Sequence, residues 1–227
     1  MALYAIADTH LSFGTNKPMD SFPGWKDYVS RIEKNWNKLV EENDTVVIAG
    51  DISWAMNFDE LKKDFEFINN LNGEKIIVKG NHDYWWNTLS KMNAFVEENG
   101  FSTIKFLFNN SYDFKDFSIC GSRGWYFDSE EAHDEKILNR EVGRLRRSIE
   151  SANSDEKIVF LHYPPITTAS KCEEILSLLK EKGIKKCYYG HLHGDAAKYA
   201  INETVDEISF ELISCDKLGF MPKLIIK

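Results

Sequence analysis

The sequence predicts a layered α/β fold with two β-sheets inside and helices outside, and two observations lead to this prediction. In the first half, short apolar runs typical of buried strands alternate with segments whose apolar residues recur at helical spacing. In the second half strands outnumber helices, which points to a second sheet. Residues 1–227 are expected to form one domain, because no repeat, low-complexity tract or linker interrupts the chain.

The first half accounts for the alternating elements. Each expected strand is a short, continuous apolar run, as in a parallel sheet that is covered on both faces. These strands are expected at residues 3–7, 45–50 and 75–80. Each is followed by a segment with an apolar helical face. The helices are expected at residues 24–42, 58–70 and 87–99.

The second half continues with more strands and two further helices. The strands are expected at residues 103–108, 111–121, 157–161, 185–189, 207–214 and 222–226. The helices are expected at residues 130–152 and 171–182.

Composition disfavours several classes of protein. The formal net charge of −8 argues against stable binding to nucleic acid, whose phosphate backbone repels an acidic chain. No apolar run approaches the roughly 20 residues of a membrane span. The four cysteines lack CxxC spacing and are interpreted as buried, reduced thiols. Together with an N-terminus that has no basic leader, they indicate a cytoplasmic protein.

Polar side chains directly follow five of the expected strands, and they include five of the six histidines. These side chains are Asp8, His10, Asp51, Asn81, His82, Asp83, His162, His191 and His193. Taken singly, each has a simpler explanation, such as a helix cap or a turn. The simpler explanation has to hold at all five strands at once. Because ligands bind beyond the carboxyl ends of strands in open α/β sheets, we expect these residues to converge on one rim.

Ligand chemistry indicates what such a rim would bind. Imidazole, carboxylate and amide oxygen without thiolate suit divalent Mn, Fe, Zn or Co. Two side chains one residue apart can face the same centre, as in the DxH and HxH spacings of this chain. Seven candidate ligands exceed the four of a single zinc site, whereas two ions that share a bridging group would use them all. The sequence predicts two divalent ions per chain, with one structural ion as the alternative.

The order of these motifs closely resembles that of the calcineurin-like metallophosphoesterases, whose signature is DxH, GD, GNH(D/E), a later His and GHxH. The corresponding stretches are "DTH" (8–10), "GD" (50–51), "GNHD" (80–83), "LHYPP" (161–165) and "GHLH" (190–193). The resemblance implies a four-layer sandwich of two mixed β-sheets flanked by helices, with metal ions at its rim. It also implies hydrolysis of a small phosphate mono- or diester.

Carried over residue by residue, the resemblance implies two ligand sets that share Asp51. One ion would be held by Asp8, His10, Asp51 and His193, and the other by Asp51, Asn81, His162 and His191. A hydroxide that bridges the ions would attack phosphorus in line with the leaving oxygen. His82 resembles the family histidine beside the substrate and is expected to protonate the leaving group or donate to a phosphate oxygen. Asp83 is expected to support His82 or to cap its own turn.

Departures from the family pattern narrow the substrate. Ser/Thr protein phosphatases of this superfamily carry GDxxDRG, but this chain has "GDISWAM", so Trp54 replaces the second Asp and no Arg follows. Protein phosphatase activity is therefore not expected, nor is nuclease activity from a short acidic chain. Three side chains are candidates for binding the substrate phosphate, namely Asn81, His82 and Arg123.

Aromatic side chains crowd the motif loops. They are Trp54, Tyr84, Trp85, Trp86, Trp125, Tyr126 and Tyr163. They either line a pocket that stacks a ring, which would suit a nucleotide, or pack beneath the loops as core. The alternative from another class is a metal-binding scaffold without activity. A scaffold of this kind should lack a metal ligand or the His of GNH, and this chain has all of them.

Overall fold

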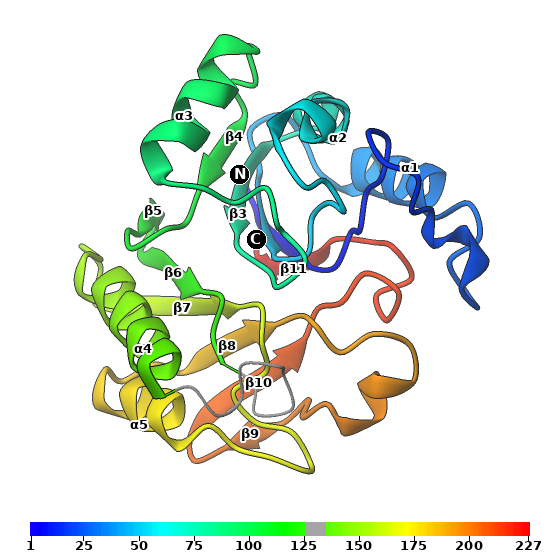
Figure 1. The fold of residues 1–227 in the computed structure, drawn as a ribbon. Helices are drawn as coiled ribbons and strands as arrows, with labels where there is room; N and C mark the ends of the chain where they lie inside the picture. The colour runs from blue at the N-terminus through cyan, green and yellow to red at the C-terminus, as the bar shows by residue number, and fades with distance from the viewer. Residues whose placement is uncertain (126–134) are drawn as a thin grey trace.

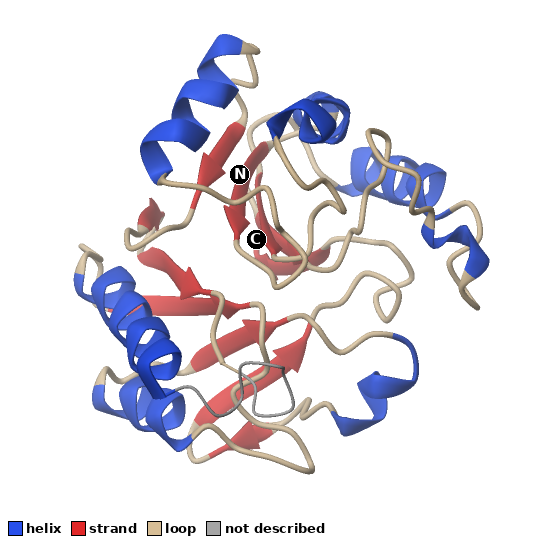
Figure 2. Ribbon diagram, viewed as in Figure 1, coloured by secondary structure: helices blue, strands red, loops and turns tan. Residues whose placement is uncertain are grey.

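The structure is a computed structural model that describes residues 1–125 and 135–227. Two β-sheets face each other in the middle of the molecule, and helices lie on their outer faces (Figures 1 and 2). This arrangement confirms the predicted four-layer α/β fold with two mixed sheets. None of the described helices has the length and apolar character needed to cross a bilayer.

The first sheet has the strand order β11-β1-β2-β3-β4. Its strands are β1 (Leu3–Ile6), β2 (Thr45–Ala49), β3 (Glu74–Val78), β4 (Ile104–Phe106) and β11 (Lys223–Ile226). β1 to β4 run parallel, and β11 returns antiparallel beside β1. Not every strand of the second half therefore joins the second sheet, because β4 and β11 extend the first.

The second sheet has the strand order β5-β6-β7-β8-β10-β9. Its strands are β5 (Tyr112–Phe114), β6 (Phe117–Ser122), β7 (Glu156–Leu161), β8 (Lys186–Tyr189), β9 (Thr204–Val205) and β10 (Ile208–Leu212). The expected single strand 111–121 is wrong. A tight turn with Lys115 at φ 51° reverses the chain, so that Phe114 pairs with Phe117. The short β9 was not expected.

Helices cover the two outer faces. They are α1 (Tyr28–Leu39), α2 (Phe58–Asn70), α3 (Leu89–Glu98), α4 (Glu135–Glu150) and α5 (Glu173–Glu181), with 3₁₀ turns η1 (Met19–Ser21) and η2 (Gly194–Tyr199). The helix expected at 24–42 begins only at Tyr28, because Asp27 has a left-handed φ of 55°. Trp25 therefore lies in the preceding loop. Of the helix expected at 130–152, residues 130–134 lie outside the described residues.

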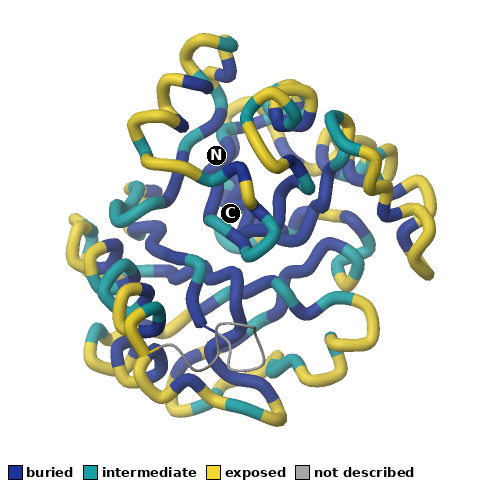
Figure 3. The backbone as a smooth tube through the Cα atoms, viewed as in Figure 1, coloured by how far each residue is buried: buried dark blue, intermediate teal, exposed yellow. Residues whose placement is uncertain are grey.

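The core is divided by the alternation of side chains along the strands. In β2, Val47 points into the layer between the sheets and Val46 points toward α1 to α3. In β7, Phe160 joins the same middle layer and Val159 points toward α4 and α5. Figure 3 shows that burial continues from the strands into several loops at their ends. Buried loops need partners for their backbone groups, and these partners position the site.

Candidate metal centre

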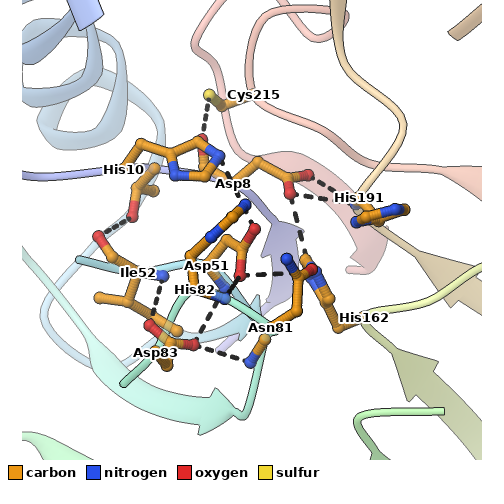
Figure 4. A network of polar contacts seen from close by, with 12 residues as sticks. Asp8, His10, Asp51, Ile52, Asn81, His82, Asp83, His162, His191 and Cys215 are labelled. Atoms are coloured by element: carbon orange, nitrogen blue, oxygen red, sulfur yellow. Dashed lines mark hydrogen bonds and ion pairs between the residues drawn. The ribbon is translucent and has the colours of Figure 1, made fainter. Parts of the chain in front are cut away.

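Loops from both sheets meet at the carboxyl ends of the strands. The first sheet supplies the loops after β1, β2 and β3, and the second supplies those after β7 and β8. Backbone hydrogen bonds join the first two loops directly: Asp8 N donates to Gly50 O at 3.0 Å and His10 N donates to Asp51 O at 3.0 Å. The two halves are linked where His191 N donates to the Asp8 carboxylate at 3.0 Å (Figure 4).

Four of the predicted ligands have a left-handed backbone. The φ angles are 60° at Asp8, 43° at His10, 52° at Asp51 and 71° at His191. Residues other than glycine rarely adopt this conformation, which costs roughly 1–3 kcal/mol each and concentrates at functional sites. The strained backbone occurs at residues whose side chains belong to one polar network (Figure 4).

Glycines in the motifs permit the loops to touch. A Cβ on Gly80 would lie 2.1 Å from the backbone nitrogen of Asp51. A Cβ on Gly190 would lie 2.6 Å from Ala7 Cβ and 2.9 Å from the carboxylate of Asp8. The absence of a side chain at these positions therefore lets the GN and GH loops contact the aspartates of the first two motifs.

Two clusters of possible ligand atoms result, and they share Asp51. Asp8, His10 and Asp51 form one cluster, and Asp51, His162 and His191 form the other, with all atoms of a cluster within 4.8 Å of one another. Asp51 Oδ2 lies 3.8 Å from His10 Nε2, whereas Asp51 Oδ1 lies 3.5 Å from His162 Nε2. The two oxygens of one carboxylate thus face different clusters.

The other two predicted ligands lie beside these clusters. Asn81 Oδ1 is 2.7 Å from His162 Nε2. The His193 ring stands nearly perpendicular to that of His10, with 5.1 Å between centroids. His191 belongs to the cluster of His162, whereas the His193 ring contacts that of His10.

The unpartnered atoms of the site suit a metal ion. His10 is 1% exposed, and neither of its ring nitrogens has a hydrogen-bond partner among the described residues. Leaving a buried polar group unpaired costs about 1–3 kcal/mol, which metal ligation would offset. His162 Nδ1 lies 3.1 Å from Ala49 O, so it donates there and leaves Nε2 as an acceptor facing the Asn81 oxygen. A cation beside two acceptors removes their repulsion.

Electrostatics lead to the same conclusion. Burial raises the pKa of Asp8 to about 7, and burial together with the charges of Asp83 and Asp8 raises the pKa of Asp51. Burial lowers the pKa of His10 and His162, and lowers that of His191 to about 4. The histidines are therefore neutral, which is the form that ligates metal, while the crowded carboxylates favour a bound cation.

Asp83 holds two of the motif loops together. Its buried carboxylate accepts from Gly80 N at 2.7 Å, Ile52 N at 2.9 Å, Asp51 N at 3.0 Å and the Trp85 indole at 3.2 Å. The bond from Gly80 caps its own turn, and the bonds from Asp51 and Ile52 fix the loop that carries the shared ligand.

His82 lies beside the two clusters. Its backbone nitrogen donates to Asp51 Oδ1 at 2.8 Å, and its Nδ1 is 3.3 Å from the Tyr84 hydroxyl. Its ring centroid lies 4.5 Å from that of Trp54 and 5.9 Å from that of His10. The ring is close to the clusters without belonging to either.

Arg123 lies behind Tyr163. Its Nη2 is 3.9 Å from Glu141 Oε1, and its Cζ lies 5.6 Å from the Tyr163 ring centroid. The Tyr163 ring in turn packs edge-on against His191 at 4.7 Å. Arg123 therefore contacts Tyr163, and Tyr163 contacts the predicted ligand His191.

A family model described as calcineurin-like phosphoesterase matches residues 1–195. The chain belongs to this family. The match covers all five motifs and confirms the resemblance found in the sequence. With the two ligand clusters, it supports a metal-dependent phosphoesterase that acts on a phosphate ester.

Individual relatives of this phosphoesterase are distant. The uncharacterized protein MJ1445 of Methanocaldococcus jannaschii is 34% identical over 86 residues, which span 36% of this chain and 46% of that protein. The phosphopantetheinyl hydrolase PptH of Mycobacterium tuberculosis has a similar fold, with a TM-score of 0.59, 15% identity and coverage of 99% and 95% of the two chains. The AQ665 protein of Aquifex aeolicus, of unknown function, has a TM-score of 0.54 at 18% identity, covering 98% and 95%.

The phosphoesterase has a cavity of about 550 Å³ beside His82 and His193. Of the aromatic residues singled out in the sequence, Trp54 lines it, whereas Trp85, Trp86 and Trp125 pack in the hydrophobic cores. Tyr84 is exposed, Tyr163 is buried, and Tyr126 lies outside the described residues.

Most of the other residues that line the cavity were not predicted from the sequence, among them Phe22, Trp25 and Asp216. Phe22 and Trp25 come from the long connection between β1 and α1, and Asp216 follows β10. The signal for the first two is "FPGW", a turn sequence inside a connection longer than most. No local pattern marks Asp216.

Proposed function

We propose that the chain is a dinuclear metal-dependent phosphoesterase that hydrolyses a phosphate mono- or diester. The observation that carries the proposal is the position of Asp51, whose two oxygens face separate clusters at 3.8 and 3.5 Å from His10 and His162. Asp8, His10, Asp51 and His193 would hold one divalent ion, and Asp51, Asn81, His162 and His191 the other. Ions such as Mn, Fe, Zn or Co suit these ligands.

The ions, when bound, would supply Lewis acidity toward the phosphoryl oxygens and lower the pKa of a water molecule. The protein residues orient the reaction. The hydrogen bond from the His82 backbone to Asp51 holds His82 beside the clusters. This position supports a role as proton donor to the leaving oxygen or as hydrogen-bond donor to a phosphate oxygen. Asn81 stands beside it as a further substrate contact.

Asp83 and Arg123 take more distant roles in this proposal. Asp83 positions Asp51 and the GNH loop through its accepted bonds. Arg123 supports Tyr163 and, through it, His191. We also infer that residues 1–227 form one domain in the cytoplasm, where four buried, unpaired thiols are stable.

The test is hydrolysis of p-nitrophenyl phosphate and bis(p-nitrophenyl) phosphate by manganese-loaded protein, with bound metal counted by mass spectrometry. We expect two ions per chain and turnover that chelation abolishes. Asp51→Asn should lose turnover and metal, whereas Asp59→Asn, an exposed residue in the first turn of α2, should retain both. Two bound ions without turnover of any phosphate ester would favour a scaffold, and one bound ion would refute the dinuclear centre.

A further inference from the structure

The cavity beside the metal centre has two chemically different walls. One wall contains Phe22, Trp25 and Trp54, and the other contains Asp195, Asp216 and Lys217. His82 and His193 join them to the ligand clusters. A volume of about 550 Å³ falls within the range of small-molecule sites, roughly 300–1,000 Å³.

The aromatic wall continues directly from the two histidines. The Trp54 ring lies 4.5 Å from that of His82, and the Trp25 ring lies 5.9 Å from that of His193. Phe22 is 55% exposed, so a large apolar face remains in water at this wall. A flat ligand that covers it would remove this surface from water and stack on the rings.

Buried polar atoms of two lining residues favour a heterocyclic ring over a hydrocarbon chain as the ligand. Asp216 Oδ1 and Trp54 Nε1 are both buried and have no hydrogen-bond partner among the described residues. One is an acceptor and the other a donor. A hydrocarbon would leave both unpaired, whereas a nucleobase carries both donors and acceptors on its edge.

The charges argue against a cationic ligand. Lys217 lies 3.6 Å from Asp216, and the Lys17 ammonium lies 5.3 Å from the centre of the Trp54 ring. Lys217 belongs to the cavity lining, as do Asp195 and Asp216, and Lys17 lies beside it. A quaternary ammonium would meet the Lys217 ammonium beside Asp216 and the Lys17 ammonium over Trp54, whereas a neutral ring attached to a phosphate would not be repelled by them.

We propose that this cavity holds the base of a nucleotide substrate, with the ring against Phe22 and Trp54 and the phosphate toward His82 and His193. The proposal rests on the proposed function, since the metal centre would receive the phosphate. It adds the substrate class and names Phe22, Trp54 and Asp216 as the residues that determine it.

The test compares binding of AMP with binding of ribose 5-phosphate, which has the same phosphate and sugar but no base. Calorimetric titration of manganese-loaded protein gives both affinities, and released phosphate is assayed afterwards so that hydrolysis is recorded separately. We expect AMP to bind about 10-fold more tightly, from base stacking. Phosphocholine serves as the probe for a cationic ligand and should bind no better than ribose 5-phosphate.

Two phenylalanine variants locate the effect. Phe22→Ala should bring the ratio of the two affinities close to one. Phe13→Ala is the matched control, because Phe13 is also exposed on the same connection but packs on Phe67. It should leave the ratio unchanged.

Equal binding of AMP and ribose 5-phosphate, tighter binding of phosphocholine than of AMP, or a ratio unaffected by Phe22→Ala would overturn the inference. Failure of the proposed function would be seen differently, as no hydrolysis of any phosphate mono- or diester, measured as released p-nitrophenol.

Discussion

Gly80→Ala tests whether direct contact between the GN and GD loops creates the metal centre. The new Cβ would lie 2.1 Å from Asp51 N and 2.2 Å from Asp51 Oδ1. Ordinary contacts of a Cβ begin near 3.4 Å, so the loops have to separate by about 1 Å. The φ of Gly80 is not positive, so the substitution isolates this steric effect from backbone strain.

The expected magnitudes follow from that displacement. Overpacking at a buried contact costs about 1–3 kcal/mol, which lowers the melting temperature by about 2–12 °C in a chain of this size. A displacement of about 1 Å in a catalytic group reduces the rate by about 100-fold. Thermal unfolding followed by circular dichroism and initial rates on p-nitrophenyl esters measure the two effects.

Gly143→Ala is the matched control. Gly143 lies within α4, and among the described residues a Cβ there would meet only Arg147 Nη1, at 3.6 Å. Because alanine favours the helix, this variant should be more stable by up to about 1 kcal/mol and fully active. If Gly80→Ala matched wild type in melting temperature and rate, close loop contact would not be what assembles the centre.

Three further predictions concern the site and its support. Asp83→Ala should weaken metal binding about 10- to 100-fold, measured by chelator competition, because Asp51 N loses its acceptor; unchanged affinity would exclude a positioning role. Removing the ions with EDTA should lower the free energy of unfolding by about 2.7 kcal/mol for each ion, relative to protein in metal at 100 times the dissociation constant, and an unchanged denaturant midpoint would contradict binding to the folded state. Leu145 lies on the buried face of α4, and Leu145→Ala should lower the free energy of unfolding in urea by about 2–5 kcal/mol while two ions remain bound per chain. Loss of metal would mean that α4 supports the centre directly.

The sequence predicts the position of those site residues that directly follow a buried strand. Asp8, Asp51 and His162 each follow a buried strand, and parallel strands bring their carboxyl ends to one edge. The ligand sets needed the order of the motifs as well, since spacing alone does not say which histidine faces which cluster.

The cavity wall depends on contacts between distant segments. Phe22 and Asp216 are brought together by the fold, and the bridge between Ala7 and Ser214 places the chain after β10 beside β1. Trp25 fits a helical pattern that the left-handed Asp27 interrupts. Arg123 is directed by Glu141, a partner in α4 that no local pattern indicates.

The division of the proposed ligands between the two sheets has a consequence for folding. Asp8, His10, Asp51 and Asn81 follow strands of the first sheet, and His162, His191 and His193 follow strands of the second. Neither group of strands carries a complete proposed set, so under this proposal high-affinity metal binding would require the two sheets to have docked. Metal binding would then be a late event in folding, and a bound ion would link the two sheets through ligands from both.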